Sequence, residues 1–164
     1  MNKKERIEQI LLTLKKRTEE NKLNYYTPYG FQKNFHETGE VANQRLLMAA
    51  NRVGKSYVGG MEMAIHSTGL YPDWWKGRKF DKPIRGWVCG ASNETTRDIC
   101  QKELFGQPDN PKDKGKGSIP KHLIGETTRK PGVPNAFSSV MVKHVSGDWS
   151  RIGFKAYEMG AEKF

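Results

Sequence analysis

The sequence is poor in cysteine and contains no long apolar run. Only two of its 164 residues are cysteine, Cys89 and Cys100, and they form no C-x-x-C pair. These two residues cannot build a disulfide framework, and the four scattered histidines complete no cluster with zinc spacing. No apolar run approaches a membrane span, and the polar N-terminus lacks the features of a signal peptide. These absences favour a cytoplasmic protein with no membrane partner.

Acidic residues are also scarce relative to basic ones. The chain has 18 Asp and Glu against 28 Lys and Arg, which gives a formal net charge of +10. A balance of this size favours a polyanionic partner, meaning nucleic acid or an acidic surface. A protein that is merely basic has the same composition, so charge alone does not establish DNA binding. The length suits one domain with a sizeable core.

Residues 45–56 have the pattern of a phosphate-binding loop. Residues 46–50 are a short apolar run that predicts a buried parallel strand, and a helical spacing of apolar residues begins after Gly54-Lys55-Ser56. The spacing between them is that of G-x-x-x-x-G-K-[ST], with Ala49 in place of the first glycine. The alternative is a chance match, because G-K-S by itself is common. The predicted strand and helix supply the context that the motif requires.

The residue types in this loop suit the binding of a triphosphate. Backbone N–H groups and a helix N-terminus bind an anion closely, and Gly54 lets the backbone turn beside it. Lys55 is expected to place a positive charge near the β and γ oxygens, and Ser56 is the candidate Mg²⁺ ligand. The candidate ATP-binding residues of the loop are Ala49, Ala50, Asn51, Arg52, Val53, Gly54, Lys55 and Ser56.

Arg52 is unusual inside such a loop. Its guanidinium could reach the γ-phosphate and stabilise charge as the phosphoryl group leaves, a role worth roughly 10³–10⁵ in rate. The alternative is an arginine that points to a carboxylate or to solvent, and spacing alone does not decide between them. With Lys55, Arg52 is a candidate catalytic residue.

An aromatic-rich segment, residues 25–32, precedes the loop. A planar base needs an apolar face to stack on and an amide to read its edge. Pro28 with Tyr29 could provide the face, and Gln32 could provide the amide, for adenine. The alternative is that these aromatic side chains fill the edge of the core, as aromatic residues in loops mostly do.

The remaining pattern predicts an α/β fold. An amphipathic helix is expected over residues 3–22, packed on the domain rather than on a partner. The helix after Ser56 is expected to end near Gly69, and residues 84–91 predict a second strand followed by a helix to about Leu104. This alternation favours a mainly parallel sheet with flanking helices, as in a P-loop NTPase.

The second half of the chain predicts a hairpin and a basic loop. Residues 138–144 and 150–157 alternate as strands do, around a turn at Gly147-Asp148. Residues 107–120 are broken repeatedly by proline and glycine, and residues 111–130 are basic. Such a loop is either a site of DNA backbone contact or an ordinary solvated loop, and the basic balance of the chain favours contact. The adjacent Trp74 and Trp75 are expected to close the core.

The acidic pair that hydrolysis needs is missing from residues 57–164. One carboxylate orients Mg²⁺ and another activates water, at the end of an apolar strand. Glu158 follows a strand that Lys155 interrupts, Asp98 lies in the predicted helix and Asp148 lies in the turn. We therefore expect residues 1–164 to be the N-terminal portion of an ATPase domain, incomplete at the C-terminal end. It would comprise a leading helix, 1–22, and a P-loop core, 23–164, without the acidic strand.

Four patches of the sequence agree in order and spacing with one family. They are Tyr26-x-Pro28-x-x-x-Gln32 with Phe35-His36, and residues 49–56, 66–75 and 149–158. The first is similar to an adenine-binding segment and the second to an arginine-bearing phosphate loop. Over roughly residues 20–164 the chain thus resembles the large terminase subunit of tailed bacteriophages, the motor that packages DNA into the capsid.

The resemblance implies an ATPase that translocates double-stranded DNA in the cytoplasm of the bacterial host. It implies a homo-oligomeric ring on the portal protein and a small terminase subunit as a further partner. Lys55 would then contact phosphate, Ser56 Mg²⁺ and Arg52 the γ-phosphate, while Gln32 would read adenine. The family's acidic strand and C-terminal nuclease domain are not in these 164 residues. The chain alone is expected to bind ATP at best.

Two rival functions remain open at this stage. One is another nucleic-acid-stimulated P-loop ATPase, of the helicase type. The other is a non-catalytic basic DNA-binding module whose loop grips the phosphate backbone. ATP binding that depends on Lys55 separates the two ATPase hypotheses from the module.

Overall fold

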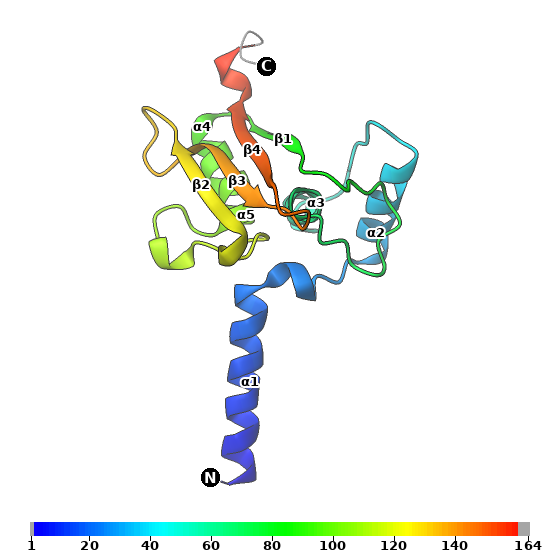
Figure 1. Ribbon diagram of the computed structural model, residues 1–164, viewed down its shortest axis with the longest axis vertical. Coiled ribbons are helices and arrows are strands. Elements are labelled where there is room, and N and C mark those ends of the chain that lie inside the picture. Colours follow the sequence, from blue (N-terminus) through cyan, green and yellow to red (C-terminus); the bar gives the residue numbers. More distant parts are fainter. Residues whose placement is uncertain (1, 161–164) are drawn as a thin grey trace.

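The computed structural model describes residues 2–160, apart from the side chain of Met159 (Figure 1). The larger helices are α1 (Lys3–Glu20), α2 (Gly30–Glu37) and α3 (Lys55–Thr68). A fourth helical region runs through α4 (Asn93–Thr95), a π-helical turn (Thr96–Gln101) and α5 (Lys102–Phe105). The strands are β1 (Arg85–Gly90), β2 (Ile124–Arg129), β3 (Phe137–Lys143) and β4 (Trp149–Ala156). Short 3₁₀ turns lie at Lys22–Tyr25, Thr38–Glu40, Pro111–Asp113, Lys121–Leu123 and Tyr157–Met159.

The sheet is mixed, which corrects the expectation of a mainly parallel one. Its strand order is β1-β4-β3-β2, with β1 parallel to β4 and the other two pairs antiparallel. The hairpin of β3 and β4 was predicted from the sequence. The expectation of a mainly parallel sheet did not take into account that the two strands of a hairpin are antiparallel. Two strands joined by a short turn pair antiparallel, whereas a parallel pair needs a longer crossover.

Residues 46–50, which were expected to form a central strand, are irregular in the structure. Leu46 and Met48 are 81% and 82% exposed. An apolar run becomes a strand only where a neighbouring strand can take its backbone hydrogen bonds. Within residues 2–160, no strand pairs with this run, so the predicted strand is wrong for the part of the chain that the structure describes.

The core lies between the sheet and helix α3. Met61 and Ile65 of α3 are fully buried, as are Val140 and Ile152 of β3 and β4. One face of β1 meets two helices, because a Cβ at Gly86 would touch Met63 of α3 and a Cβ at Gly90 would touch Thr96. Helix α3 and the helical region that follows β1 therefore cover the same face of the sheet.

Local signals in the sequence placed several element ends well. Helix α3 ends at Gly69, whose positive φ of 72° continues the chain in a left-handed turn, as predicted. Ser92 caps α4 by accepting a hydrogen bond from the Thr95 N–H. Strand β2 was missed, because its sequence lies inside the stretch interpreted as a basic loop.

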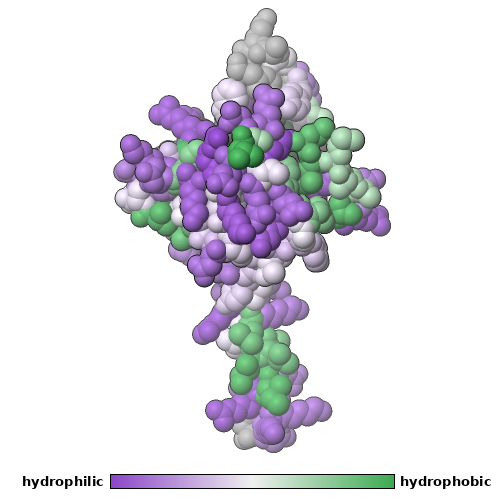
Figure 2. All heavy atoms as spheres, turned by 90° about the vertical axis from the view of Figure 1, so that its right-hand side faces the viewer, coloured by the Kyte–Doolittle hydropathy of each residue, from purple (hydrophilic) through white to green (hydrophobic). Residues whose placement is uncertain are grey.

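Helix α1 projects away from the body of the molecule (Figure 1). It begins where predicted, with a capping box formed by Asn2 and Glu5, and ends at Glu20, two residues before the predicted end at Lys22. None of its residues is buried, however, so the expectation that it packs on the domain is wrong. Figure 2 shows its apolar side chains gathered on a projecting surface. The exposed stripe consists of Ile7, Ile10, Leu11 and Leu14, and Leu12 is exposed on another face of the helix.

Candidate nucleotide-binding site

The predicted phosphate-binding loop, residues 49–56, runs from the end of the irregular segment 44–50 into the first turn of α3. Gly54 occupies the N-cap of α3 with a φ of 87°, in the left-handed region that only glycine adopts without strain. Arg52 also has a positive φ, 63°, which is costly for a residue with a side chain. Such strain persists only where the surrounding structure imposes it, and it clusters at functional sites.

The side chain of Lys55 folds back over the loop. Its Nζ donates hydrogen bonds to the carbonyl oxygens of Ala49 and Ala50, at 2.7 and 2.6 Å. The ammonium group is thus held at the mouth of the loop, where two carbonyl dipoles partly neutralise it. An anion placed here would exchange those two carbonyls for a stronger charged partner.

The loop presents its residues to solvent. Ala49, Ala50, Asn51, Arg52 and Ser56 are exposed, while Val53, Gly54 and Lys55 are half-buried. Ser56 lies in the first turn of α3, next to the N–H groups that point out of the helix N-terminus. The sequence-predicted loop residues are therefore together and accessible, at a helix end that suits a negatively charged ligand.

Gln32 lies against the loop rather than out in solvent. It is 2% exposed, its Oε1 accepts from the Tyr29 N–H at 3.0 Å, and its Nε2 donates to the Val53 carbonyl at 3.5 Å. Pro28 is half-buried and Tyr29 is 71% exposed. Gln32 thus joins the start of α2 to the predicted loop, and the amide that was expected to read adenine is buried and hydrogen-bonded within the protein.

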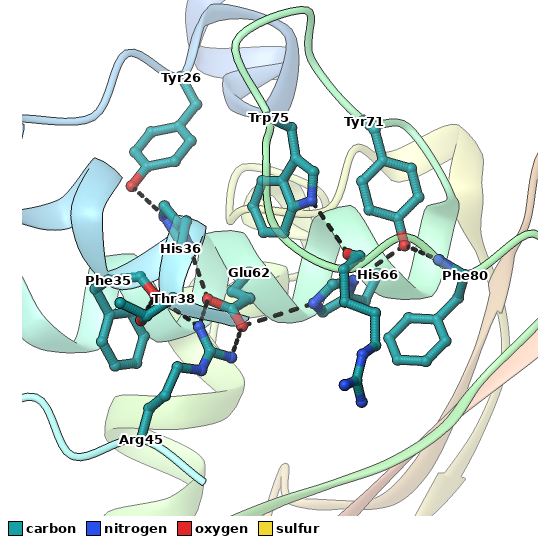
Figure 3. Close-up of polar contacts among 11 residues, drawn as sticks. Tyr26, Phe35, His36, Thr38, Arg45, Glu62, His66, Tyr71, Trp75 and Phe80 are labelled. Atoms are coloured by element: carbon teal, nitrogen blue, oxygen red, sulfur yellow. Dashed lines mark hydrogen bonds and ion pairs between the residues drawn. The ribbon is translucent and has the colours of Figure 1, made fainter. Parts of the chain in front are cut away.

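A buried cluster behind the loop was not predicted. Its centre is Glu62 of α3, which is 8% exposed (Figure 3). We call it the Glu62 cluster; its members are Tyr26, His36, Arg45, Glu62, His66 and Tyr71. A single acid among the buried residues of a helix is the sequence signal that could have revealed it, since a buried carboxylate requires partners.

Three basic side chains converge on the Glu62 carboxylate. Arg45 donates to both carboxylate oxygens, through Nη1 at 3.2 Å and through Nη2. His36 Nδ1 lies 2.7 Å from Oε2, and His66 Nε2 lies 3.6 Å from Oε1. Burial by itself raises the pKa of Glu62. Hydrogen bonds from these three partners lower it by more, so the pKa lies well below its usual value.

Two tyrosines complete the cluster. The Tyr26 hydroxyl lies 3.0 Å from His36 Nε2, and the Tyr71 hydroxyl lies 3.0 Å from His66 Nδ1. Burial raises the pKa of both tyrosines, so they remain neutral. The ring of Trp75 lies beside both histidines, with ring centroids 5.1 and 5.3 Å apart. Trp75 is 4% exposed, in agreement with its predicted role in closing the core.

Other candidates from the sequence have structural roles. Glu158 accepts hydrogen bonds from the backbone and side chain of Asn93, at the start of α4. Arg97 pairs with Asp98 and donates to the Pro134 carbonyl. Among residues 2–160, no group of three or more His, Cys, Asp or Glu is arranged to hold a metal ion. None of the described helices is both long and apolar enough to cross a membrane.

The fold and the loop together define an α/β protein with a phosphate-binding loop motif at the start of a helix. A family model described as "Terminase large subunit, T4likevirus-type, N-terminal" matches residues 46–164. The chain is 33% identical over 156 residues to the large terminase subunit of Salmonella phage P22. The chain belongs to the terminase large-subunit family, as its resemblance indicated.

The similarity to the phage P22 protein covers 85% of this chain but 31% of that relative. The chain therefore spans about a third of the length of the relative it matches. No solved structure gives a significant match.

Proposed function

We propose that this chain is the ATP-binding part of a viral DNA-packaging motor. The observation that carries the proposal is the position of Lys55 over an accessible loop at the N-terminus of α3. Membership of the terminase family adds support, because it favours a packaging motor over an ATPase of the helicase type. The net charge of +10 suits a chain that works on DNA.

Each loop residue has a defined task in this proposal. Lys55 pairs with the β and γ oxygens, and the backbone of residues 49–54 surrounds the phosphates. Ser56 holds Mg²⁺, which when bound neutralises charge on the phosphate oxygens. Arg52 stabilises the γ-phosphate, and Pro28 with Gln32 faces adenine. The residue types fit the group, since a hydroxyl suits Mg²⁺ and two cations suit a triphosphate.

Hydrolysis and translocation belong to the longer protein. Residues 57–160 place no acidic pair beside the loop, and Glu158 is already engaged with Asn93. We propose that ATP hydrolysis in the longer protein drives double-stranded DNA through a homo-oligomeric ring. The portal protein and a small terminase subunit are its proposed partners, in the cytoplasm of the bacterial host.

The first prediction concerns Lys55. We expect the wild-type chain to bind MgATP in a calorimetric titration and the Lys55→Ala variant to show no measurable binding. The reason is that the variant loses the positive charge that lies at the mouth of the loop. Lys112→Ala, in the exposed loop before β2, is the matched control and should bind MgATP like the wild type.

The same pair of variants tests the non-catalytic rival. A DNA-binding module predicts no MgATP binding by the wild-type chain, together with weaker DNA binding by Lys55→Ala. That combination would contradict the ATP-binding proposal. Retention of MgATP binding by Lys55→Ala would contradict the role given to this residue.

A further inference from the structure

The Glu62 cluster lies where three segments of the nucleotide site meet. Glu62 is on α3, two turns beyond the loop, and its carboxylate contacts both His36 of α2 and Arg45 of the segment that leads into the loop (Figure 3). His36 belongs to α2, which also carries Gln32. Arg45 begins the run of residues 45–50 that enters the loop. The Glu62 carboxylate thus contacts both α2 and the segment that enters the loop.

Arg45 holds the segment of residues 44–50 that leads into the loop. Besides its two hydrogen bonds to Glu62, it donates to the Phe35 carbonyl at 2.7 Å and lies over the Phe35 ring at 4.6 Å. Residues 44–50 have no helix or strand hydrogen bonds of their own. Their position therefore depends on side-chain contacts, those of Arg45 at one end and of Lys55 at the other.

The histidine side of the cluster fixes α2. His36 is fully buried and is held between Glu62 and Tyr26. One turn earlier on α2, Gln32 reaches the Val53 carbonyl of the loop. A shift of α2 away from α3 would therefore move the amide that touches the loop.

We propose that Glu62 is a positioning residue for the nucleotide site: through Arg45 and His36 it sets where the phosphate-binding loop lies relative to α2. This inference rests on the proposed function. It requires the negative charge, because the bidentate pair with the Arg45 guanidinium needs two carboxylate oxygens. A glutamine of the same size would keep one acceptor and lose the pairing with two basic partners.

The test is a double-mutant cycle on the intact chain. We expect Glu62→Gln and Arg45→Met each to weaken MgATP binding by about tenfold, a usual size for coupling between sites. The double variant should bind about as weakly as either single variant, because both changes break the same contact. Independent effects that multiply to about 100-fold would overturn the proposal, as would unchanged binding.

Glu103→Gln is the matched control. Glu103 lies on α5, is half-buried, contacts Gly60 of α3 and has Ser118 as its polar partner. Within the described part of the chain, Glu103 forms no hydrogen bond or ion pair with residues 44–54, so this variant tests destabilisation of α3 without the positioning effect. We expect this variant to bind MgATP like the wild type. If Glu103→Gln weakened MgATP binding as much as Glu62→Gln, the effect of Glu62 would be one of general stability and not of positioning.

Amide hydrogen exchange without nucleotide separates failure of this inference from failure of the proposed function. In Glu62→Gln, exchange should accelerate at the hydrogen-bonded amides of α2, which His36 connects to Glu62, while strands β3 and β4 stay protected. That result supports the positioning role even if the wild-type chain binds no MgATP. Equal acceleration throughout the chain, or none in α2, would overturn it.

Discussion

At the scale of single residues, Glu62 carries a charge that is buried in the interior and held by basic partners. Removing one partner of a buried ion pair typically costs about 3–5 kcal/mol, because the other charge is left without compensation. Glu62 is 8% exposed and has three basic partners, so its ionised form is the one that the fold stabilises. The residues of the proposed nucleotide-binding loop are exposed or half-buried by contrast, so changing them should affect ligand binding more than folding.

The second prediction is a dependence of stability on acid pH. The pKa of Glu62 is lowered from its ordinary 4.5, so its contribution to stability is complete above that value and is lost as the pH falls below it. Each pH unit below 4.5 should cost the wild type about 1.4 kcal/mol more than it costs Glu62→Gln. Urea unfolding between pH 6 and pH 3.5 measures the difference. Parallel curves for the two proteins would contradict the assignment.

At the scale of elements, the patterns that are complete within a short window were predicted correctly. Helix α3, with its cap at Gly69, and the hairpin of β3 and β4 depend on periodicity and turn residues alone. Residues 46–50 were wrongly predicted to be a strand because a strand depends on a partner that a local pattern does not contain. Strand β2 was missed because its polar sequence, IGETTR, has little apolar alternation.

The candidate site shows the same difference between features with a local sequence pattern and features that depend on tertiary packing. The loop was predicted from the sequence because its chemistry requires fixed residue types at fixed spacing, and its role in nucleotide binding stays a prediction. The Glu62 cluster was not identified, because its members come from positions 26 to 71 and only tertiary packing brings them together. His36 was noticed as part of a resemblance, without its partner Glu62.

The third prediction concerns α1, whose residues are all unburied. Removal of residues 2–20 should leave the free energy of unfolding within about 0.5 kcal/mol of the wild type, because surface changes away from packed features have effects of that size. The chain would still contain Leu23, which is 5% exposed in the core. Denaturant unfolding followed by tryptophan fluorescence provides the measurement.

The matched contrast is Ile152→Ala in β4, whose side chain is fully buried. It should cost about 2–5 kcal/mol, since it leaves a cavity in the core. A truncation that destabilises the chain as strongly as this substitution would show that α1 packs on the body after all.

At the scale of the whole molecule, the proposed nucleotide site lies at the N-terminal end of α3, and the Glu62 cluster lies further along this helix, beside the aromatic residues of the core. Tyr26, His36 and Trp75 join the cluster to that core through ring contacts 5.1–5.8 Å apart. The sheet, with its buried face on α3, provides the fixed support.

The most direct test of the nucleotide site is a map of amide hydrogen exchange across the intact chain, with and without MgATP. We predict that MgATP slows exchange in residues 49–58, which form the loop and the first turn of α3, and that Lys55→Ala abolishes this protection. Protection confined to another part of the chain, or no protection at MgATP concentrations that saturate binding, would contradict the assignment of this loop as the nucleotide site.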